Sequence, residues 1–548
     1  MDPLISTALT WRAQDPDPDT VARLDDLIAA YGSGDESART ELAAEFAGPL
    51  EFGTAGLRGP LGPGPARMNR VVVTQAAAGF GRWLIAAGHH GGKVIVGYDA
   101  RYKSADFARD TAEVLAAQGF TPLLTARAAP TPVVAFGIRE YGCVAGIVVT
   151  ASHNPAQDNG YKVYLGDGSQ IVPPTDTEIA AQIAEVAARP LPEVLRSDAY
   201  ELLGDELVDA YVAHAASLLP ESAPRQVSWA YTAMHGVGAR VIEAVAAAAG
   251  LPAPVVVRAQ HDPDPDFPTV PFPNPEEPGA IDLAVALARE QGVDVVVAND
   301  PDADRCAAAV EIDGTWRMLT GDELGSLLAE DALRRGVTGV YASSIVSSSL
   351  LPRLAAAYGQ PYEATLTGFK WIGRVPGLAF GYEEAIGYCC DPRAVPDKDG
   401  ITAGLRLLAL TASLHAEGLT LADRLNEIAA VYGLHTTAQL AVRVEEESLI
   451  TDAMARLRAN PPATLLGEPV TVIDLAQGGD LPPTDGVRLE GKTLRVVVRP
   501  SGTEPKLKCY LEVRATPEAS RDVRAARADA DSKVAQLRTE ISRALGIV

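Results

Sequence analysis

Short runs of β-branched residues alternate with alanine-rich amphipathic stretches along most of the chain. The apolar runs 94–96 and 146–149 are typical of buried strands, and residues 104–118 between them have helical spacing. Strands that alternate with helices in this way are characteristic of layered α/β folds. The same alternation recurs in the segment 227–257, in the expected helices 280–291 and 322–335, and in the expected strands 293–297 and 339–345.

The two ends of the chain depart from this alternation. Residues 1–45 have a helical pattern that places Val21, Leu24 and Ile28 on one face, which predicts a helical extension packed on the first domain. The C-terminal part combines expected helices across 401–431, strands at 437–444 and 494–498, and a charged helix at 517–544. This mixture predicts a smaller α+β domain at the end of the chain.

Chain length limits the number of domains. At about 100–200 residues per domain, 548 residues correspond to about three to five domains. We predict three similar α/β domains and the C-terminal domain, with these boundaries: extension 1–45, then 46–200, 201–314, 315–436 and 437–548. The Pro- and Asp-rich segment 261–278 is the longest loop-like stretch, and loops of this length are usually functional or form an interface strap.

Acidic residues outnumber basic ones, 71 against 47, and the net charge is −24. This charge opposes binding to nucleic acid and to anionic membrane surfaces. The N-terminus lacks a basic region followed by a hydrophobic one, and no stretch reaches the ~18 apolar residues of a membrane span. With five scattered cysteines, these features predict a soluble cytoplasmic protein without nucleic-acid or membrane partners. Monomer and homodimer both stay open.

A serine motif follows the predicted strand 146–149. Ser152 lies at the carboxyl end of that strand, where α/β sheets place ligands, and a serine there can act as a nucleophile. The neighbouring His153 suggests a base, and Lys162 a cation for an anionic substrate. The alternative is a turn or helix cap. A hydrolase triad is poorly supported, because no third member lies nearby.

Three aspartates follow the predicted strand 293–297. Asp300, Asp302 and Asp304 alternate, so an extended segment would point all three carboxylates the same way, which suits Mg²⁺. The alternative is an acidic surface turn. An EF-hand loop fails, although Glu311 is at its twelfth position, because Arg305 occupies the sixth position, which requires glycine.

Three further motifs carry groups that suit a phosphorylated ligand. Arg499-Pro-Ser-Gly-Thr offers a guanidinium, hydroxyls and loop amides for phosphate, or is a plain turn. Glu383 and Glu384 follow an expected strand and can accept hydrogen bonds from sugar hydroxyls, although paired glutamates are also common on surfaces. The glycine-rich loop 53–59 carries Arg58, which could reach a transferring phosphoryl group.

Taken together and in this order, the motifs resemble those of the α-D-phosphohexomutase superfamily, from about residue 45 to the C-terminus. The resemblance implies four domains around one cleft and a phosphoserine at Ser152. It also implies one Mg²⁺ per chain, held by Asp300, Asp302, Asp304 and a phosphoserine oxygen, and a sugar 1,6-bisphosphate as activator. The implied reaction moves a phosphoryl group between two positions of a small-molecule phosphosugar.

The resemblance also assigns further residues to the site. It places Arg58 and Lys162 close to the reacting phosphate and hydroxyl. His153 stays a candidate catalytic residue from its place beside Ser152, and Arg305 is expected to add positive charge in the cleft. The residues it implies for substrate binding are Gly368, Lys370, Glu383, Ala385, Arg393, Lys398, Arg499, Ser501, Gly502 and Thr503.

The chain departs from well-known members of the superfamily in its sugar loop. Ala385 stands where many members have serine, and Gly387 lies near the place of a histidine found in some bacterial phosphomannomutases. The Glu-Glu-Ala-Ile-Gly sequence and the Gly368-Phe-Lys-Trp loop are more similar to the phosphoglucomutase-2 and phosphopentomutase branch. Glucose phosphate is therefore the first expectation, pentose phosphate the second and mannose phosphate the third. A hexose bisphosphate synthase and a non-catalytic sugar-phosphate-binding scaffold remain alternatives.

Other conspicuous residues have structural interpretations. We expect His235 to be a turn or packing residue, Asp99 and Arg101 to pair with each other, and Cys389 and Cys390 to be buried thiols.

Overall fold

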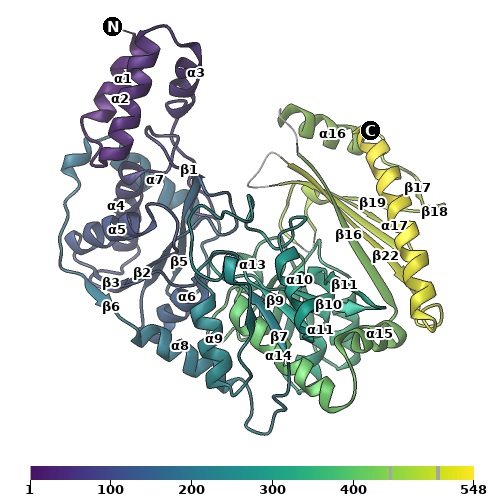
Figure 1. The fold of residues 1–548 in the computed structure, drawn as a ribbon. Coiled ribbons are helices and arrows are strands. Elements are labelled where there is room, and N and C mark those ends of the chain that lie inside the picture. Colours follow the sequence, from purple (N-terminus) through teal and green to yellow (C-terminus); the bar gives the residue numbers. More distant parts are fainter. Residues whose placement is uncertain (1, 444–446, 480, 502–505, 548) are drawn as a thin grey trace. The chain divides into compact units, whose positions relative to one another are not determined.

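The computed structural model describes residues 2–443, 447–479, 481–501 and 506–547 (Figure 1). The chain packs into two compact units. The first consists of residues 1–309 and 387–413, and the second of residues 310–386 and 414–548. The chain therefore leaves the first unit at residue 309, returns for one short segment and then completes the second unit.

The N-terminal extension is helical, as predicted. It forms α1 (Pro3–Arg12), α2 (Pro18–Gly32) and α3 (Glu36–Glu45). Aspartate side chains cap each of these helices by accepting hydrogen bonds from backbone amides of the first turn. Trp11, Leu24 and Leu42 are buried in the same hydrophobic core as Val71 and Phe80, so the extension packs on the domain that follows.

A six-stranded mixed sheet forms the first part of unit 1. Its order is β1-β5-β4-β2-β3-β6, with β5 antiparallel to both β1 and β4. Val94 and Val96 of β2 pack with Phe107, whereas Ile95 faces Gly137 of α6, so helices cover both faces. The elements are β1 (Leu57–Pro60), α4 (Arg70–Ala86), β2 (Lys93–Tyr98), α5 (Ser104–Ala117), β3 (Thr121–Thr125), α6 (Thr131–Glu140), β4 (Ala145–Val149), β5 (Asp158–Leu165), α7 (Thr175–Ala187), η1 (Leu191–Glu193), β6 (Glu201–Leu203) and α8 (Glu206–Ser217).

A second sheet contains β8, β7, β9 and β10 in that order, with β11 (Thr315–Met318) beside β10; the chain passes from unit 1 to unit 2 within β10. Strands β7, β8 and β9 are parallel, and β10 runs antiparallel to β9. The predicted strand 293–297 corresponds to β9, and residues 261–278 form neither helix nor strand, as predicted. The elements around this sheet are β7 (Trp229–Thr232), α9 (Ala239–Ala248), β8 (Val255–Val256), η2 (Arg258–Gln260), α10 (Asp282–Gln291), β9 (Val295–Ala298) and β10 (Ala307–Ile312). The returning segment adds β15 (Gly387–Cys389), which is not a strand of this sheet, and α14 (Gly400–Ala416).

Unit 2 begins with a third α/β segment, in which β12 is parallel to β13 and β14. A capping box formed by Thr320 and Glu323 starts α11. The elements are β11 (Thr315–Met318), α11 (Gly321–Arg334), β12 (Val340–Ser344), α12 (Leu350–Ala357), β13 (Tyr362–Thr365), α13 (Phe369–Ile372) and β14 (Leu378–Glu383).

The C-terminal part of unit 2 is an antiparallel sheet of order β16-β22-β21-β20-β19, and α17 packs on β16 and β22. The predicted helix 517–544 begins later than expected, at Val523, because residues 517–520 form a turn and Asp522 caps the helix. The elements are α15 (Leu421–Tyr432), β16 (Leu434–Arg443), α16 (Glu447–Ala459), β17 (Thr464–Leu465), β18 (Glu468–Pro469), β19 (Thr471–Asp474), η3 (Leu475–Gln477), β20 (Val487–Glu490), β21 (Leu494–Pro500), β22 (Lys506–Ala515) and α17 (Val523–Leu545).

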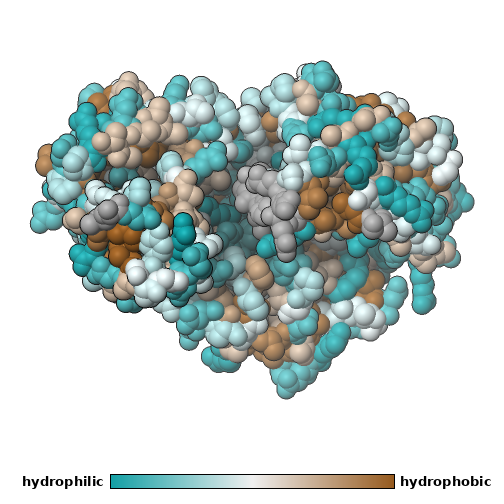
Figure 2. Space-filling view, turned by 90° about the horizontal axis from the view of Figure 1, so that it is seen from above, coloured by the Kyte–Doolittle hydropathy of each residue, from teal (hydrophilic) through white to brown (hydrophobic). Residues whose placement is uncertain are grey.

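The face of the molecule shown in Figure 2 is largely hydrophilic. On the face shown in Figure 2, hydrophobic groups lie apart and are separated by hydrophilic residues. Among the described residues, no helix combines the length and the apolar composition needed to cross a membrane.

Candidate active site

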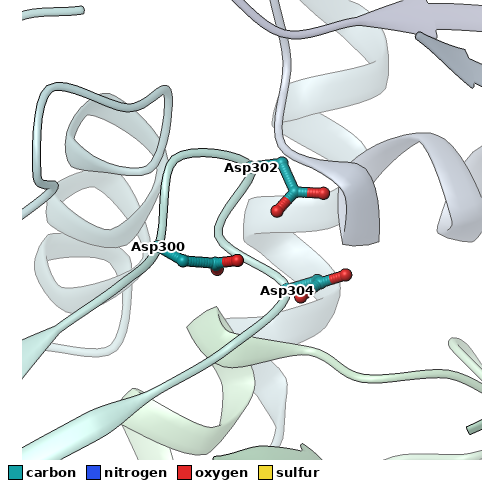
Figure 3. A group of neighbouring side chains, drawn as sticks. All are labelled: Asp300, Asp302 and Asp304. Atoms are coloured by element: carbon teal, nitrogen blue, oxygen red, sulfur yellow. The ribbon is translucent and has the colours of Figure 1, made fainter. Parts of the chain in front are cut away.

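Three buried carboxylates converge in the loop between β9 and β10. Asp300, Asp302 and Asp304 each offer an oxygen, and these oxygens lie within 4.8 Å of one another (Figure 3). The loop is a tight turn and not the extended segment expected from the sequence: the Ala303 amide donates to the Asp300 carbonyl at 2.8 Å, and Ala303 has a φ of 55°. The side chains converge as expected, but a turn and not an extended segment brings them together, so the predicted reason was wrong.

Two lysines and a threonine contact these carboxylates. Lys162 Nζ, on β5, lies 2.7 Å from Asp302 Oδ2 and 2.8 Å from Asp304 Oδ2. Lys398 Nζ lies 3.3 Å from Asp304 Oδ2. Thr131, at the start of α6, donates to Asp302 Oδ2 at 2.6 Å. Three different segments of unit 1 therefore stabilise one acidic loop.

The pKa values of the three carboxyls differ because the lysines are unevenly placed. Burial and the charges of Asp302 and Asp304 raise the pKa of Asp300 well above its usual value. Burial also acts to raise the pKa values of Asp302 and Asp304. Lys162 together with Thr131 at Asp302, and Lys162 together with Lys398 and Arg305 at Asp304, outweigh it, and both pKa values are lowered. Burial acts to lower the pKa of Lys162, and the two carboxylates raise it above the usual value. Lys162 is therefore charged near neutral pH.

Ser152 lies directly against this acid loop. Its Oγ donates to Asp300 Oδ2 at 2.7 Å and lies 3.1 Å from His153 Nδ1. Its φ of 53° lies in the left-handed region, which is uncommon for a residue with a side chain and is concentrated at functional sites. The structure thus brings together the serine and the three aspartates that the sequence singled out separately.

Positive groups surround the serine. Arg58 Nη1 donates to Asn154 Oδ1 at 3.1 Å, and burial lowers the pKa of Arg58 from its usual value. Burial, together with the charges of Arg305 and Arg58, lowers the pKa of His153 well below its usual value. The His153 ring is therefore neutral near pH 7 and can accept a proton from a neighbouring hydroxyl.

The acid loop fits a hard divalent cation. Asp302 Oδ1 and Asp304 Oδ1 are buried and accept no hydrogen bond from the described residues, although buried polar atoms are normally satisfied. Carboxylate oxygens are the ligands that Mg²⁺ prefers. The unsatisfied oxygens and their spacing therefore match the predicted metal ligands.

A second group of predicted residues lies in unit 2. Glu383, at the end of β14, accepts a hydrogen bond from the Gly368 amide at 3.1 Å. Glu384 lies beside it, half-buried, and accepts hydrogen bonds from Ser344 Oγ at 2.9 Å and Ser347 Oγ at 3.0 Å. Burial and the charge of Glu383 raise the pKa of Glu384 to about 7. Glu384 is therefore the structurally constrained member of the pair.

Arg499 belongs to the same neighbourhood of unit 2. The buried Tyr510 has a pKa raised well above its usual value by burial and by the charge of Glu384, while the charge of Arg499 acts to lower it. Tyr510 is thus within electrostatic reach of both Glu384 and Arg499. The Ser501 amide donates to the Lys506 carbonyl at 2.8 Å. Two other predicted residues, Gly502 and Thr503, lie outside the described residues.

Three predicted substrate-binding residues remain, Lys370, Ala385 and Arg393. Lys370 lies on the short helix α13, and Ala385 follows the glutamate pair; both are half-buried. Arg393 is exposed, and its carbonyl accepts a hydrogen bond from Arg139. Their roles stay predictions.

Sequence reasoning missed Thr131 and Asn154 as partners of site residues. Thr131 carries no recognisable signal, because it begins a helix far from the acid loop in the sequence, whereas Asn154 lies within the serine motif itself. The expected structural roles agree with the contacts: Arg101 Nε lies 3.4 Å from Asp99 Oδ2, and His235 is a buried turn residue that contacts Thr269. Cys389 is a buried free thiol, whereas Cys390 is half-buried.

Four family models match most of the chain in sequence order. They are described as phosphoglucomutase/phosphomannomutase alpha/beta/alpha domains I, II and III and C-terminal domain, and they match residues 49–189, 209–313, 320–432 and 440–530. The chain belongs to the phosphoglucomutase/phosphomannomutase family. The predicted superfamily, its four-domain α/β architecture and an enzyme of the phosphosugar mutase type are thereby confirmed. The exact domain boundaries given above stay a prediction.

Individual members of the phosphoglucomutase/phosphomannomutase family are similar over most of their length. A probable phosphomannomutase of Haemophilus influenzae is 47% identical over 459 residues, which cover 82% of this chain and 93% of that protein. Mouse phosphopentomutase is 36% identical over 567 residues, covering 92% and 90%. A crystal structure of a putative phosphomannomutase from Thermus thermophilus aligns with a TM-score of 0.69 at 28% identity, covering 86% of this chain and 97% of that one.

Loss of one predicted metal ligand should weaken magnesium binding. Asp302→Asn keeps the side-chain volume but removes one negative charge, so we expect the Mg²⁺ affinity measured by isothermal titration calorimetry to fall at least ~10-fold. The matched control is Asp262→Asn, since the Asp262 side chain is 92% exposed. Equal Mg²⁺ affinities of the wild type and Asp302→Asn would contradict the assignment.

The raised pKa of Glu384 predicts a pH-dependent stability of unit 2. The carboxyl is protonated up to about pH 7 in the folded protein, but only up to about 4.5, its ordinary pKa, in the unfolded chain. The folded state binds more protons in this window, so its stability should fall as the pH rises through it.

Urea unfolding between about pH 5 and about pH 8 tests this linkage. Glu384→Gln cannot ionise and should flatten the fall in the free energy of unfolding. Glu363→Gln changes an exposed glutamate on β13 and should retain the wild-type slope. A Glu384→Gln variant with an unchanged slope would show that another group is responsible.

Proposed function

We propose that the protein is a phosphosugar mutase that moves a phosphoryl group between O1 and O6 of glucose phosphate. The proposed reaction uses a phosphoserine at Ser152 and a glucose 1,6-bisphosphate intermediate. The observation that carries this proposal is the 2.7 Å contact between Ser152 Oγ and Asp300 at the edge of a buried acid loop. Membership of the phosphoglucomutase/phosphomannomutase family supports the same reaction type.

The proposed reaction has two balanced transfers. In the first, the bond between phosphorus and Ser152 Oγ breaks while a bond to a free sugar hydroxyl oxygen forms, and the hydroxyl proton passes to a base. The resulting bisphosphate then reorients in the site, so that its other phosphate faces Ser152. In the second transfer, Ser152 Oγ accepts the other phosphoryl group, and a proton returns to the sugar oxygen that is released.

Residues of unit 1 supply the charges for these transfers. Arg58 and Lys162 would bind the oxygens of the transferring group, and neutral His153 would accept a proton near Ser152 Oγ. Arg305 and Lys398 add positive charge beside the acid loop. Mg²⁺, held by Asp300, Asp302, Asp304 and a phosphoserine oxygen, would neutralise the charge that phosphoryl transfer spreads over the phosphate oxygens.

Residues of unit 2 would bind the sugar and the phosphate that is not reacting. Glu383 would accept hydrogen bonds from sugar hydroxyls, and Arg499 would bind the phosphate as a bidentate donor. These contacts must hold the bisphosphate in both of its orientations, so their binding energy is used to position the ligand. The other residues of unit 2 proposed for substrate binding are Gly368, Lys370, Ala385, Ser501, Gly502 and Thr503; Arg393 and Lys398, of unit 1, are proposed for the same role.

A phosphopentomutase is the second candidate. The mouse relative with that name matches 92% of this chain, and the same chemistry would move a phosphoryl group between O1 and O5 of ribose. Mannose phosphate, which the name of the Haemophilus influenzae relative favours, is the third candidate. We also propose a cytoplasmic location and a monomeric or homodimeric state.

Removal of the Ser152 hydroxyl should abolish the mutase reaction. With Mg²⁺ and a trace of glucose 1,6-bisphosphate, we expect Ser152→Ala to lower kcat for glucose 1-phosphate at least ~1,000-fold, because the variant lacks the oxygen that accepts the phosphoryl group. Ser37→Ala, at an exposed position of α3, is the control and should retain wild-type kcat. Phosphopeptide mass spectrometry should locate phosphate on Ser152 of the wild type.

Two outcomes would refute the mutase proposal. One is wild-type kcat in Ser152→Ala. The other is the absence of turnover with every hexose, pentose and hexosamine phosphate tested, which would favour a binding scaffold. Release of free bisphosphate from 1,3-bisphosphoglycerate and glucose phosphate would identify a bisphosphate synthase instead.

A substrate panel should rank the sugars. We expect kcat/KM to be highest for glucose 1-phosphate, lower for ribose 1-phosphate and lowest for mannose 1-phosphate. The physical reason is that a sugar with a misplaced hydroxyl leaves an acceptor such as Glu383 unpaired in the transition state. A higher kcat/KM for ribose 1-phosphate would instead establish the pentose assignment.

A further inference from the structure

Arg101 is buried beneath the serine loop, residues 150–158, and donates to four of its backbone carbonyls. Its Nη2 lies 2.7 Å from the carbonyl oxygen of Ser152 and 2.5 Å from that of Asn154. Its Nη1 lies 2.7 Å from the carbonyl oxygen of Pro155 and 3.1 Å from that of Asp158. The residue is only 5% exposed. One guanidinium therefore joins four positions of this loop.

These hydrogen bonds act on the unusual backbone of Ser152. The residue has a φ of 53°, and its amide donates to Thr150 Oγ1 at 2.8 Å while Arg101 holds its carbonyl. Both peptide groups flanking Ser152 are thus fixed by side chains. The direction in which Oγ points toward Asp300 depends on that backbone conformation.

Two groups hold Arg101 in place. Asp99 accepts a hydrogen bond from the Arg101 amide at 3.0 Å and faces Nε at 3.4 Å. The ring of Phe267 covers the guanidinium, with 4.9 Å between the Arg101 Cζ and the ring centroid. Phe267 is itself only 3% exposed. It belongs to the long loop 261–278, which we call the strap.

The strap is attached at both sides of the site. Tyr102, next to Arg101, donates to Asp266 Oδ1 at 2.9 Å. His235 Nε2 lies 2.8 Å from Thr269 Oγ1. The turn that contains His235 also reaches the acid loop, because the Val237 amide donates to the Pro301 carbonyl at 2.8 Å. The strap therefore contacts Arg101 and Tyr102 beside the serine loop, and it also contacts the His235 turn, which is hydrogen-bonded to the acid loop.

We propose that Arg101, covered by the strap, is a positioning residue that holds Ser152 in the backbone conformation required for phosphoryl transfer. The inference rests on the proposed mutase function. Arg101 acts through backbone carbonyls and contributes no contact to the sugar, so its loss should slow the transfer step while substrate binding is retained. A lysine cannot replace it, because a single ammonium lacks the planar fork that spans four carbonyls.

The test compares Arg101→Lys, Phe267→Leu and the control Arg109→Lys. Arg109 lies on α5 with a side chain that is 53% exposed. The measurements are kcat and KM for glucose 1-phosphate, and the rate at which glucose 1,6-bisphosphate phosphorylates Ser152, followed by intact-protein mass spectrometry. Arg101→Lys should lower kcat and the phosphorylation rate about 10- to 100-fold with little change in KM. Phe267→Leu should lower both rates about threefold, and Arg109→Lys should change nothing.

The outcomes separate this inference from the proposed function. If the wild type shows neither turnover nor phosphoserine, the mutase proposal itself fails. If the wild type is active and Arg101→Lys matches it, or raises KM with kcat unchanged, the positioning role is wrong. If Arg101→Lys does not fold, Phe267→Leu decides: a lowered kcat at constant KM supports the role, and wild-type kcat overturns it.

Discussion

The repulsion among three buried carboxylates is the constraint around which unit 1 is organised. Burying a charge without a partner costs several kcal/mol per ion, so the acid loop is stable only with cations beside it. Lys162 reaches Asp302 and Asp304 from β5, and Lys398 reaches Asp304 from the segment before α14. The first sheet supplies one of these cations, Lys162, and the returning segment supplies the other, Lys398. Both features therefore contribute to neutralising the acid loop.

The same charge balance explains why the serine contacts Asp300 and not its neighbours. Lys162 and Thr131 occupy Oδ2 of Asp302, whereas no lysine in the described part of the chain pairs with Asp300. Asp300 consequently has the highest proton affinity of the three and is the acceptor for Ser152 Oγ. A cation bound by the unsatisfied oxygens of Asp302 and Asp304 would also lower the proton affinity of Asp300. Metal binding would thereby be coupled to the hydrogen bond between Ser152 Oγ and Asp300.

Local patterns were enough to predict most elements and to single out side chains that the fold brings together. Alternation of apolar runs located β2, β4 and α5, and residue types located the aspartates and Ser152. The mutual arrangement was only partly predictable. An extended segment was expected at Asp300 to Asp304, and the left-handed Ala303 that produces the turn carries no signal, since alanine rarely adopts this conformation. Partners such as Thr131 are recognised only after folding, because they lie 171 residues from their contacts.

Capping residues explain a smaller error of the same kind. The charged helix near the C-terminus was expected from residue 517, but Asp522 accepts a hydrogen bond from the Ala525 amide and starts α17 at Val523. Periodicity identifies a helix better than it identifies the first residue, because the cap is one side chain in an otherwise polar segment.

The discontinuous course of unit 1 has a consequence for synthesis in the cell. The acid loop leaves the ribosome with Lys162 already made, but Lys398 is still to come. At ordinary elongation rates the intervening stretch takes roughly 5–20 s to translate. During that interval the nascent loop lacks one of its counter-charges, so this region of the polypeptide should reach its final state only after the returning segment has emerged.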